Sequence, residues 1–190
     1  MKRAVLIGNS RQISELKTIM PLANYQAIAT TSNGIEGLRL FHRFEPDLVI
    51  MTGNVLGLSA FDLLQSIITQ RICPVIVIIS QEDTNALPEI IKLNAHYVLV
   101  QPLRAFDLIA AVLYSEQRFS EEQKNLKITT HLEKELKVRK IHYQALLTLI
   151  GKKGYDENTA YRVMQQYAMS KHKTMYSVAM EVLKGSWLPE

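Results

Sequence analysis

The stretch PDLVIMTGNVLGL, residues 46–58, decides the fold class. Its apolar run LVIM (48–51) is short and does not alternate with polar residues, which is typical of a strand buried on both faces. The run ends at Thr52 and Gly53, just past the carboxyl end of the strand, where open α/β sheets build their sites. Neither residue is an acid, so the sequence raises the question of whether this edge retains any chemistry.

Runs of the same kind recur through the first 115 residues, separated by amphipathic stretches. The predicted strands are AVLIG (4–8), QAIAT (26–30), LVIM (48–51), VIVIIS (75–80) and YVLV (97–100), and helices are predicted over 11–21, 34–43, 59–70, 84–93 and from 104 onward. This alternation predicts an α/β fold, a flavodoxin-like doubly wound five-stranded parallel sheet with helices on both faces.

Composition favours a cytoplasmic protein without a membrane segment. The chain is 47% hydrophobic and 21% charged, and no window holds 18 uninterrupted apolar residues. The five apolar residues after Met1-Lys2-Arg3 are too few for the core of a signal peptide. Cys73 is the single cysteine and lies within an apolar run, so we expect a buried thiol in a reducing compartment.

Positive charge is concentrated at the C-terminal end of the chain. Residues 1–136 hold 13 Lys and Arg against 14 Asp and Glu, whereas residues 137–190 hold 9 against 4. An uneven distribution of this kind points to a polyanionic partner for the C-terminal part, and a basic solvated surface is the alternative interpretation.

The pattern changes after Pro102, because residues 104–150 contain neither proline nor glycine. We expect three parts: a sheet domain over 1–115, a helical connector over 116–136 and a helical bundle over 137–190. The connector is polar with sparse apolar positions, and we expect it to dimerise as a coiled coil; a solvated spacer helix is the alternative. Its candidate dimer residues are Phe119, Leu126, Leu132 and Leu136.

Short helices are predicted to form the last part, a C-terminal three-helix bundle. Gly151 and Gly154 end the first helix, and Asp156 is placed to cap the second. Apolar residues at helical spacing define the buried face. The predicted core residues in the second and third helices are Ala160, Tyr161, Met164, Ala168 and Ala179.

The order of strands and helices, with PDLVIM (46–51), PVIVII (74–79) and VQPL (100–103), resembles a two-component receiver domain. The resemblance implies an acceptor aspartate after the third strand, an acid pair that holds Mg²⁺, a hydroxyl residue and a lysine. In this chain the corresponding positions hold Gly8, Asn9, Thr52, Ile79 and Gln101. Ser80 would supply the hydroxyl if the alignment shifts by one residue. We therefore expect a pseudo-receiver with no cofactor, no metal and no aspartyl phosphate.

The segment 138–183, and GYDENTAYRVMQQYAM within it, resembles the ANTAR domain, an RNA-binding module of transcription antitermination regulators. The family's helix-defining alanines fall at Ala145, Ala160, Ala168 and Ala179, with Tyr161 as the aromatic. Leu146 and Leu147 depart from the pattern, because many members have lysine and glycine there. The whole chain is similar to the amide-responsive antiterminators of amidase operons, which a partner sensor protein holds inactive.

The resemblance implies an RNA-binding protein, most simply a homodimer that binds leader RNA hairpins under the control of a ligand-sensing protein partner. The candidate RNA contacts are Lys152, Lys153, Arg162, Gln165, Gln166, Lys171, His172 and Lys173. No nucleophile is paired with a base, so we expect no enzyme activity. Two alternatives remain, a docking adapter that binds no RNA and a DNA-binding regulator. Asp156 and Glu157 would repel DNA phosphate at the start of the second bundle helix.

Overall fold

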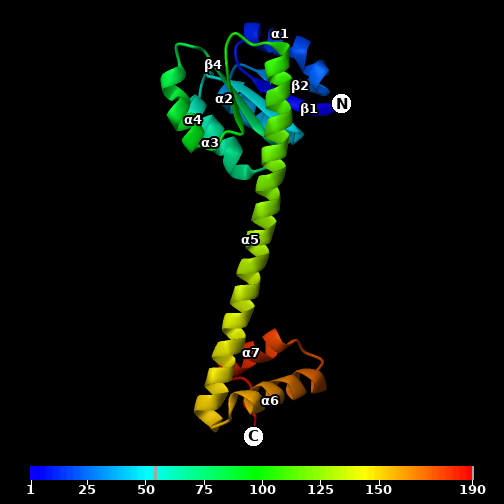
Figure 1. Ribbon diagram of the computed structural model, residues 1–190, viewed down its shortest axis with the longest axis vertical. Helices are drawn as coiled ribbons and strands as arrows, with labels where there is room; N and C mark the ends of the chain where they lie inside the picture. Colours follow the sequence, from blue (N-terminus) through cyan, green and yellow to red (C-terminus); the bar gives the residue numbers. More distant parts are fainter. Residues whose placement is uncertain (54, 190) are drawn as a thin grey trace. The chain divides into compact units, whose positions relative to one another are not determined.

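The computed structural model describes residues 1–53 and 55–189. The N-terminal strands and helices alternate, and helices alone follow them (Figure 1). The strands are β1 (Lys2–Ile7), β2 (Tyr25–Thr31), β3 (Leu48–Thr52), β4 (Val75–Ile79) and β5 (Tyr97–Val100). The helices are α1 (Ser10–Ile19), α2 (Gly34–Phe44), α3 (Ala60–Gln70), α4 (Leu87–Lys92), α5 (Ala105–Lys153), α6 (Glu157–Ser170) and α7 (Met175–Lys184), with short 3₁₀ turns η1 (Met20–Ala23) and η2 (Thr84–Ala86).

The five strands form one parallel sheet in the order β2-β1-β3-β4-β5, which confirms the predicted fold class. The register pairs Ile7 with Met51 and Thr52 with Ile78, so the carboxyl ends of the central strands lie at one edge. The chain divides into two compact units, Met1–Gln123 and Lys124–Glu190. This division falls inside the predicted connector.

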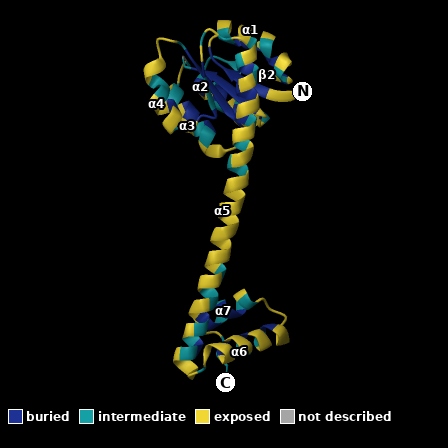
Figure 2. Ribbon diagram, viewed as in Figure 1, coloured by how far each residue is buried: buried dark blue, intermediate teal, exposed yellow. Residues whose placement is uncertain are grey.

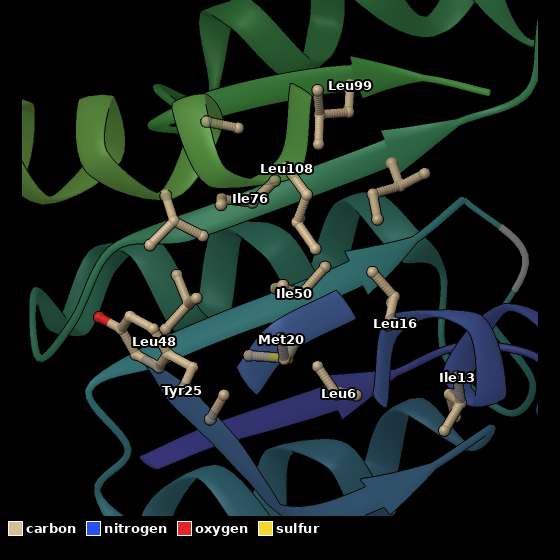
Figure 3. Packing of buried hydrophobic residues seen from close by; sticks show 14 residues of the cluster. Leu6, Ile13, Leu16, Met20, Tyr25, Leu48, Ile50, Ile76, Leu99 and Leu108 are labelled. Carbon is tan, nitrogen blue, oxygen red and sulfur yellow. The ribbon is translucent and has the colours of Figure 1, made fainter. Parts of the chain in front are cut away.

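Each face of the sheet has its own hydrophobic core. Side chains of α1 and α5, among them Leu16 and Leu108, pack against Leu6, Ile50 and Ile76 on one face (Figure 3). Helices α2, α3 and α4 cover the other face with a second apolar cluster. The central strands β1, β3 and β4 are mostly buried (dark blue in Figure 2), and their side chains contribute to both clusters, which explains why their sequences do not alternate.

Helix α5 is one continuous helix of 49 residues, whereas the sequence predicted a closing helix, a connector and a first bundle helix ended by Gly151 and Gly154. Gly151 is helical, and the helix ends at Lys153, before Gly154, whose φ is +67°. A positive φ is the conformation that glycine adopts at a helix end without steric cost. The helix therefore passes through Gly151 and ends just before Gly154, the second of the two glycines at which its end was predicted.

Side chains near residue 120 fasten α5 to the N-terminal unit. Arg118 donates to the carbonyl oxygens of Ala95 and His96, and the ring of Phe119 meets the His96 ring edge-on at 5.4 Å. His96 is buried and its Nδ1 accepts from the Val75 N–H, and burial lowers the pKa of its imidazole. Phe119 thus packs within this unit, and its place in a dimer seam stays a prediction.

The C-terminal unit has a small core built from α5, α6 and α7. Buried side chains from the three helices meet there, and small residues let the helices approach closely. The buried residues of this core are Ala145, Leu149, Ala160, Met164, Ala168, Val178, Ala179 and Val182. Tyr161 is 49% exposed and is not part of it, so its assignment to the core was wrong. It follows Ala160 by one residue, and the 100° step around the helix turns it toward solvent.

Candidate functional site

The carboxyl edge of the sheet brings together the positions that form the phosphorylation site in a working receiver. Gly8 follows β1, Thr52 ends β3, Ile79 ends β4 and Gln101 follows β5. Backbone hydrogen bonds fix this edge, since the Gly53 N–H donates to Ile78 and the Gln101 N–H donates to Ile79, at 3.0 and 2.9 Å. Register alone explains this convergence, because parallel strands end together.

Asn9 is held at the same edge as the N-cap of α1. Its side-chain oxygen accepts from the Gln12 N–H at 2.9 Å, so the amide oxygen is engaged by the helix end. Ser80, the alternative hydroxyl, donates to Asp83 Oδ2 at 2.7 Å. The residues at the five carried-over positions supply no carboxylate, and a set of glycine, amide, threonine and isoleucine does not suit Mg²⁺, which favours carboxylate oxygen.

The Thr52 side chain packs directly against Gly8 at this edge of the sheet. Thr52 is 1% exposed, and its Oγ1 has no hydrogen-bond partner among the described residues. A Cβ built on Gly8 would lie 2.3 Å from Thr52 Oγ1 and 2.7 Å from its Cγ2. Such distances are well inside van der Waals contact, so Thr52 occupies the space that a side chain at position 8 would need.

We expect these two positions to be coupled energetically. Gly8→Ala should lower the free energy of unfolding by about 1–3 kcal/mol, because the new methyl group overlaps Thr52. In a Thr52→Ala background the same change should cost much less. A thermodynamic cycle measured by urea unfolding of the four proteins checks this, and additive effects of the two substitutions would contradict the packing described here.

The candidate RNA contacts lie on three segments of the C-terminal unit, and all of them are exposed. Lys152 and Lys153 end α5, and Arg162, Gln165 and Gln166 lie on the solvent side of α6, opposite Ala160, Met164 and Ala168. The turn between α6 and α7 carries the remaining three residues, and His172 there has a φ of +52°. Asp156 caps α6 by accepting from the Thr159 N–H, and hydrogen bonding from the Thr159 side chain, together with this backbone bond, lowers the pKa of its carboxyl group.

Lys173 is tied within the unit, unlike the other candidate cations in the described chain. Its Nζ lies 2.6 Å from Glu181 Oε1, which raises the pKa of the ammonium group, and 5.6 Å from the centre of the Tyr167 ring. Trp187, which the sequence pattern left unassigned, stacks on Tyr167 at 4.0 Å with an interplanar angle of 16°. Lys173 therefore connects the α6–α7 turn to both helices.

An apolar stripe that sequence reasoning only partly found lies along α5 in the C-terminal unit. Leu132, Leu136, Tyr143 and Leu147 are 51%, 65%, 58% and 49% exposed. With 3.6 residues per turn they span roughly 60° of the helix circumference, and Ala145 points about 180° away from Leu136 toward the bundle core. The four residues are called the α5 stripe below. Leu126 is 37% exposed and lies about 80° from Leu136, outside the stripe.

Comparison with known families decides what these two units are. The response regulator receiver domain model matches residues 9–113, more than half of the chain. The chain belongs to the response regulator receiver family. The ANTAR domain model matches residues 130–183, so this receiver protein carries an ANTAR domain at its C-terminal end. Receiver–ANTAR proteins are transcription regulators that act without enzyme activity, and an ANTAR domain implies RNA binding.

The curated relatives that the chain matches are also named as regulators. The chain is 27% identical to the transcriptional regulatory protein PdtaR of Mycobacterium tuberculosis, over 99% of this chain and 93% of that protein. It is 31% identical to the aliphatic amidase regulator of Pseudomonas aeruginosa, over 57% of this chain and 55% of that protein. The receiver–ANTAR regulator is thus a distant homologue of both.

Solved structures agree with the receiver fold. A response regulator receiver domain protein from Clostridium thermocellum superposes with a TM-score of 0.56 at 26% identity, covering 62% of this chain and 96% of that one. A signal receiver domain of a modulated diguanylate cyclase from Desulfovibrio desulfuricans superposes with a TM-score of 0.59 at 18% identity, covering 64% and 98%, and supports the fold alone. None of the helices in the described residues is long and apolar enough to cross a membrane.

Proposed function

We propose that this receiver–ANTAR regulator binds hairpin loops in nascent leader RNA through its C-terminal unit and so prevents transcription termination. The observation that carries the proposal is the group of exposed cations and amides at the end of α5, on α6 and in the α6–α7 turn, within the ANTAR match. Lysines at helix ends suit contact with phosphate, and the amide and guanidinium groups of α6 suit unpaired loop bases.

We further propose that the receiver is controlled without aspartyl phosphorylation. Support comes from the carboxyl edge, where Thr52 stands at the acceptor position and packs against Gly8. Phosphoryl transfer needs an acceptor, a metal and positive charge that stabilise the developing anions, and the residues at these positions provide none of them. Control then rests on differential binding of a partner or a second copy to two states of the protein.

A homodimer formed along the α5 stripe is the second part of this control. The stripe is apolar, exposed and faces away from the bundle core, and Leu136 and Tyr143 are one heptad apart. Two linked ANTAR domains would bind tandem hairpins with an affinity that exceeds that for one hairpin through effective concentration. A ligand-sensing protein partner could compete for the same surface.

A docking adapter that binds no RNA is the second candidate. The observation that favours it is Leu146 and Leu147, where many ANTAR domains have lysine and glycine. Leu146, at the lysine position, packs against the bundle core, so the usual positive charge is absent there. Leu147, at the glycine position, is 49% exposed and adds apolar surface beside it.

Titration of tandem-hairpin RNA with the full chain tests the proposed function. We expect binding that weakens steeply between ~50 and ~200 mM salt and that exceeds binding to duplex DNA of the same length. Pre-incubation with acetyl phosphate and Mg²⁺ should change neither the affinity nor the mass of the protein. Absence of RNA binding at low salt would favour the adapter, and a phosphoryl adduct that hydroxylamine removes, as it does an acyl phosphate, would refute control without phosphorylation.

A further inference from the structure

A small cavity lies beside the carboxyl edge of the sheet, between the ends of β3 and β4 and the helices α3 and α4. Its volume is about 160 Å³. The residues that line it are Met51, Gly53, Ala60, Phe61, Leu64, Val77, Ile79, Asp83, Ala86 and Ile90. Most of these side chains are apolar and come from the second hydrophobic core, so the cavity is a recess in that core that opens toward the edge.

Two residues at the ends of β3 and β4, Gly53 and Ile79, shape this recess. Gly53 follows the acceptor position, and a Cβ built on it would have one described atom within 4 Å, Asp83 Oδ2 at 4.0 Å. The absence of a side chain at position 53 therefore leaves open space. Ile79 replaces the hydroxyl residue at the end of β4 and gives the neighbouring wall an apolar surface.

Asp83 supplies one polar group at the mouth of this apolar recess. Among the described residues that line the cavity, it is the single charged one. Its Oδ2 accepts a hydrogen bond from the Ser80 hydroxyl, and the Asp83 N–H donates back to Ser80 Oγ at 3.2 Å. This local loop fixes the carboxylate at the mouth and leaves acceptor capacity for a donor that enters from solvent.

We propose that this cavity binds a small ligand with an apolar body the size of one aromatic ring and a protonated amine as its head. An apolar cavity of about 150 Å³ is large enough for benzene, and the volume here is comparable. The apolar body buries against Phe61, Leu64 and Ile90, and the ammonium group donates to the Asp83 carboxylate.

The inference goes beyond the proposed function, because it assigns the receiver a ligand site of its own. The cavity touches Gly53 and Ile79, which flank the lost phosphorylation site, and it touches both α3 and η2. A ligand that binds one conformation of these elements better than another shifts the receiver toward it, which is the role that phosphorylation has in working receivers. RNA plays no part in the binding test, so failure of the ligand site and failure of the RNA proposal are distinguishable.

The test uses three probes that share one body, namely benzylamine, toluene and benzoate. Methyl resonances of the isotope-labelled full chain are followed during titration with each probe. We expect benzylamine and toluene to shift methyl groups that line the cavity, Leu64, Val77, Ile79 and Ile90. Benzylamine should bind more tightly than toluene, and benzoate should bind least because its charge opposes Asp83.

Two variants distinguish the contribution of the apolar ring to binding from that of the ammonium group. Gly53→Leu should fill the recess and abolish binding of both benzylamine and toluene, and Gly53 has no positive φ that would strain a leucine. Asp83→Asn should weaken benzylamine about fivefold or more and leave toluene within about twofold. Ala60→Leu, on the α3 wall, is a second filling variant that is used if Gly53→Leu does not fold.

Several results would overturn the site. Absence of methyl shifts up to the solubility limit of toluene and at ~20 mM benzylamine would show that the recess is closed to ligands. Equal binding by wild type and a folded filling variant would place the probes elsewhere. Equal affinity of benzylamine for wild type and Asp83→Asn would show that the ammonium group does not bind the Asp83 carboxylate.

Discussion

Replacing Lys152, Lys153 and Lys171 with alanine is expected to lower the affinity for hairpin RNA roughly 10- to 100-fold at ~0.15 M salt. The three lysines are exposed and form no ion pair among the described residues, so their charges are free to meet phosphate. Each phosphate contact that is lost should also reduce the slope of log K against log salt by about 0.7–0.9. Fluorescence anisotropy at four salt concentrations measures both quantities.

A matched control removes the same charge outside the ANTAR match. Lys92, Lys124 and Lys127 are exposed, and their triple alanine variant has the same net charge as the first variant. Its RNA affinity should stay within about threefold of wild type, because only long-range attraction is lost and salt screens it. An equal loss of affinity in both variants would mean that net charge alone, and not the proposed surface, drives binding.

Lys173 should behave differently from Lys171, although both were predicted as RNA contacts from the same sequence motif. Its ammonium group is already paired with Glu181 and lies over the Tyr167 ring. Periodicity could not predict this, because the contact joins the α6–α7 turn to the middle of α7. Trp187 was unassigned for the same reason, since it follows the end of α7 and its partner Tyr167 lies 20 residues earlier in α6.

The sheet was predictable because parallel strands buried on both faces leave unbroken runs of Val, Ile and Leu. The five strands were placed within one or two residues of their observed ends. The positions that correspond to the phosphorylation site of a working receiver converge in the structure for the same reason, since register brings strand ends together whatever residues they carry. The sequence could not reveal that Thr52 fills the space above Gly8, or that Gly53 leaves a recess, because these are matters of side-chain packing.

Burial along α5 was the least predictable feature. An apolar segment, a polar segment and a second apolar segment follow one another in this single helix. Its side chains are partly buried near both ends and exposed in the middle (Figure 2). Phe119 and Leu132 are both apolar residues at helical spacing, yet the first packs against His96 and the second is 51% exposed. Spacing identifies a helix face, but only the positions of neighbouring elements determine whether that face is already covered.

Leu136→Glu is expected to raise the dissociation constant of the proposed homodimer at least ~100-fold. Leu136 is 65% exposed in the single chain, so the substitution should change the stability of the monomer by less than about 0.5 kcal/mol. In a seam along the α5 stripe, each copy would bury a leucine worth about 1.5–3 kcal/mol, and two facing carboxylates would replace both. Sedimentation equilibrium over a range of protein concentrations measures the change.

Thr130→Glu is the matched control for this prediction. Thr130 is exposed, lies six residues away on α5 and receives the same charge, but it is about 120° around the helix from Leu136. Its dimer constant should stay within about threefold of wild type. If Leu136→Glu dimerises as well as Thr130→Glu, the α5 stripe is not the dimer seam. If Leu136→Glu is monomeric, its affinity for tandem hairpins should fall to that for a single hairpin, because the gain from linkage depends on two ANTAR domains held in one particle.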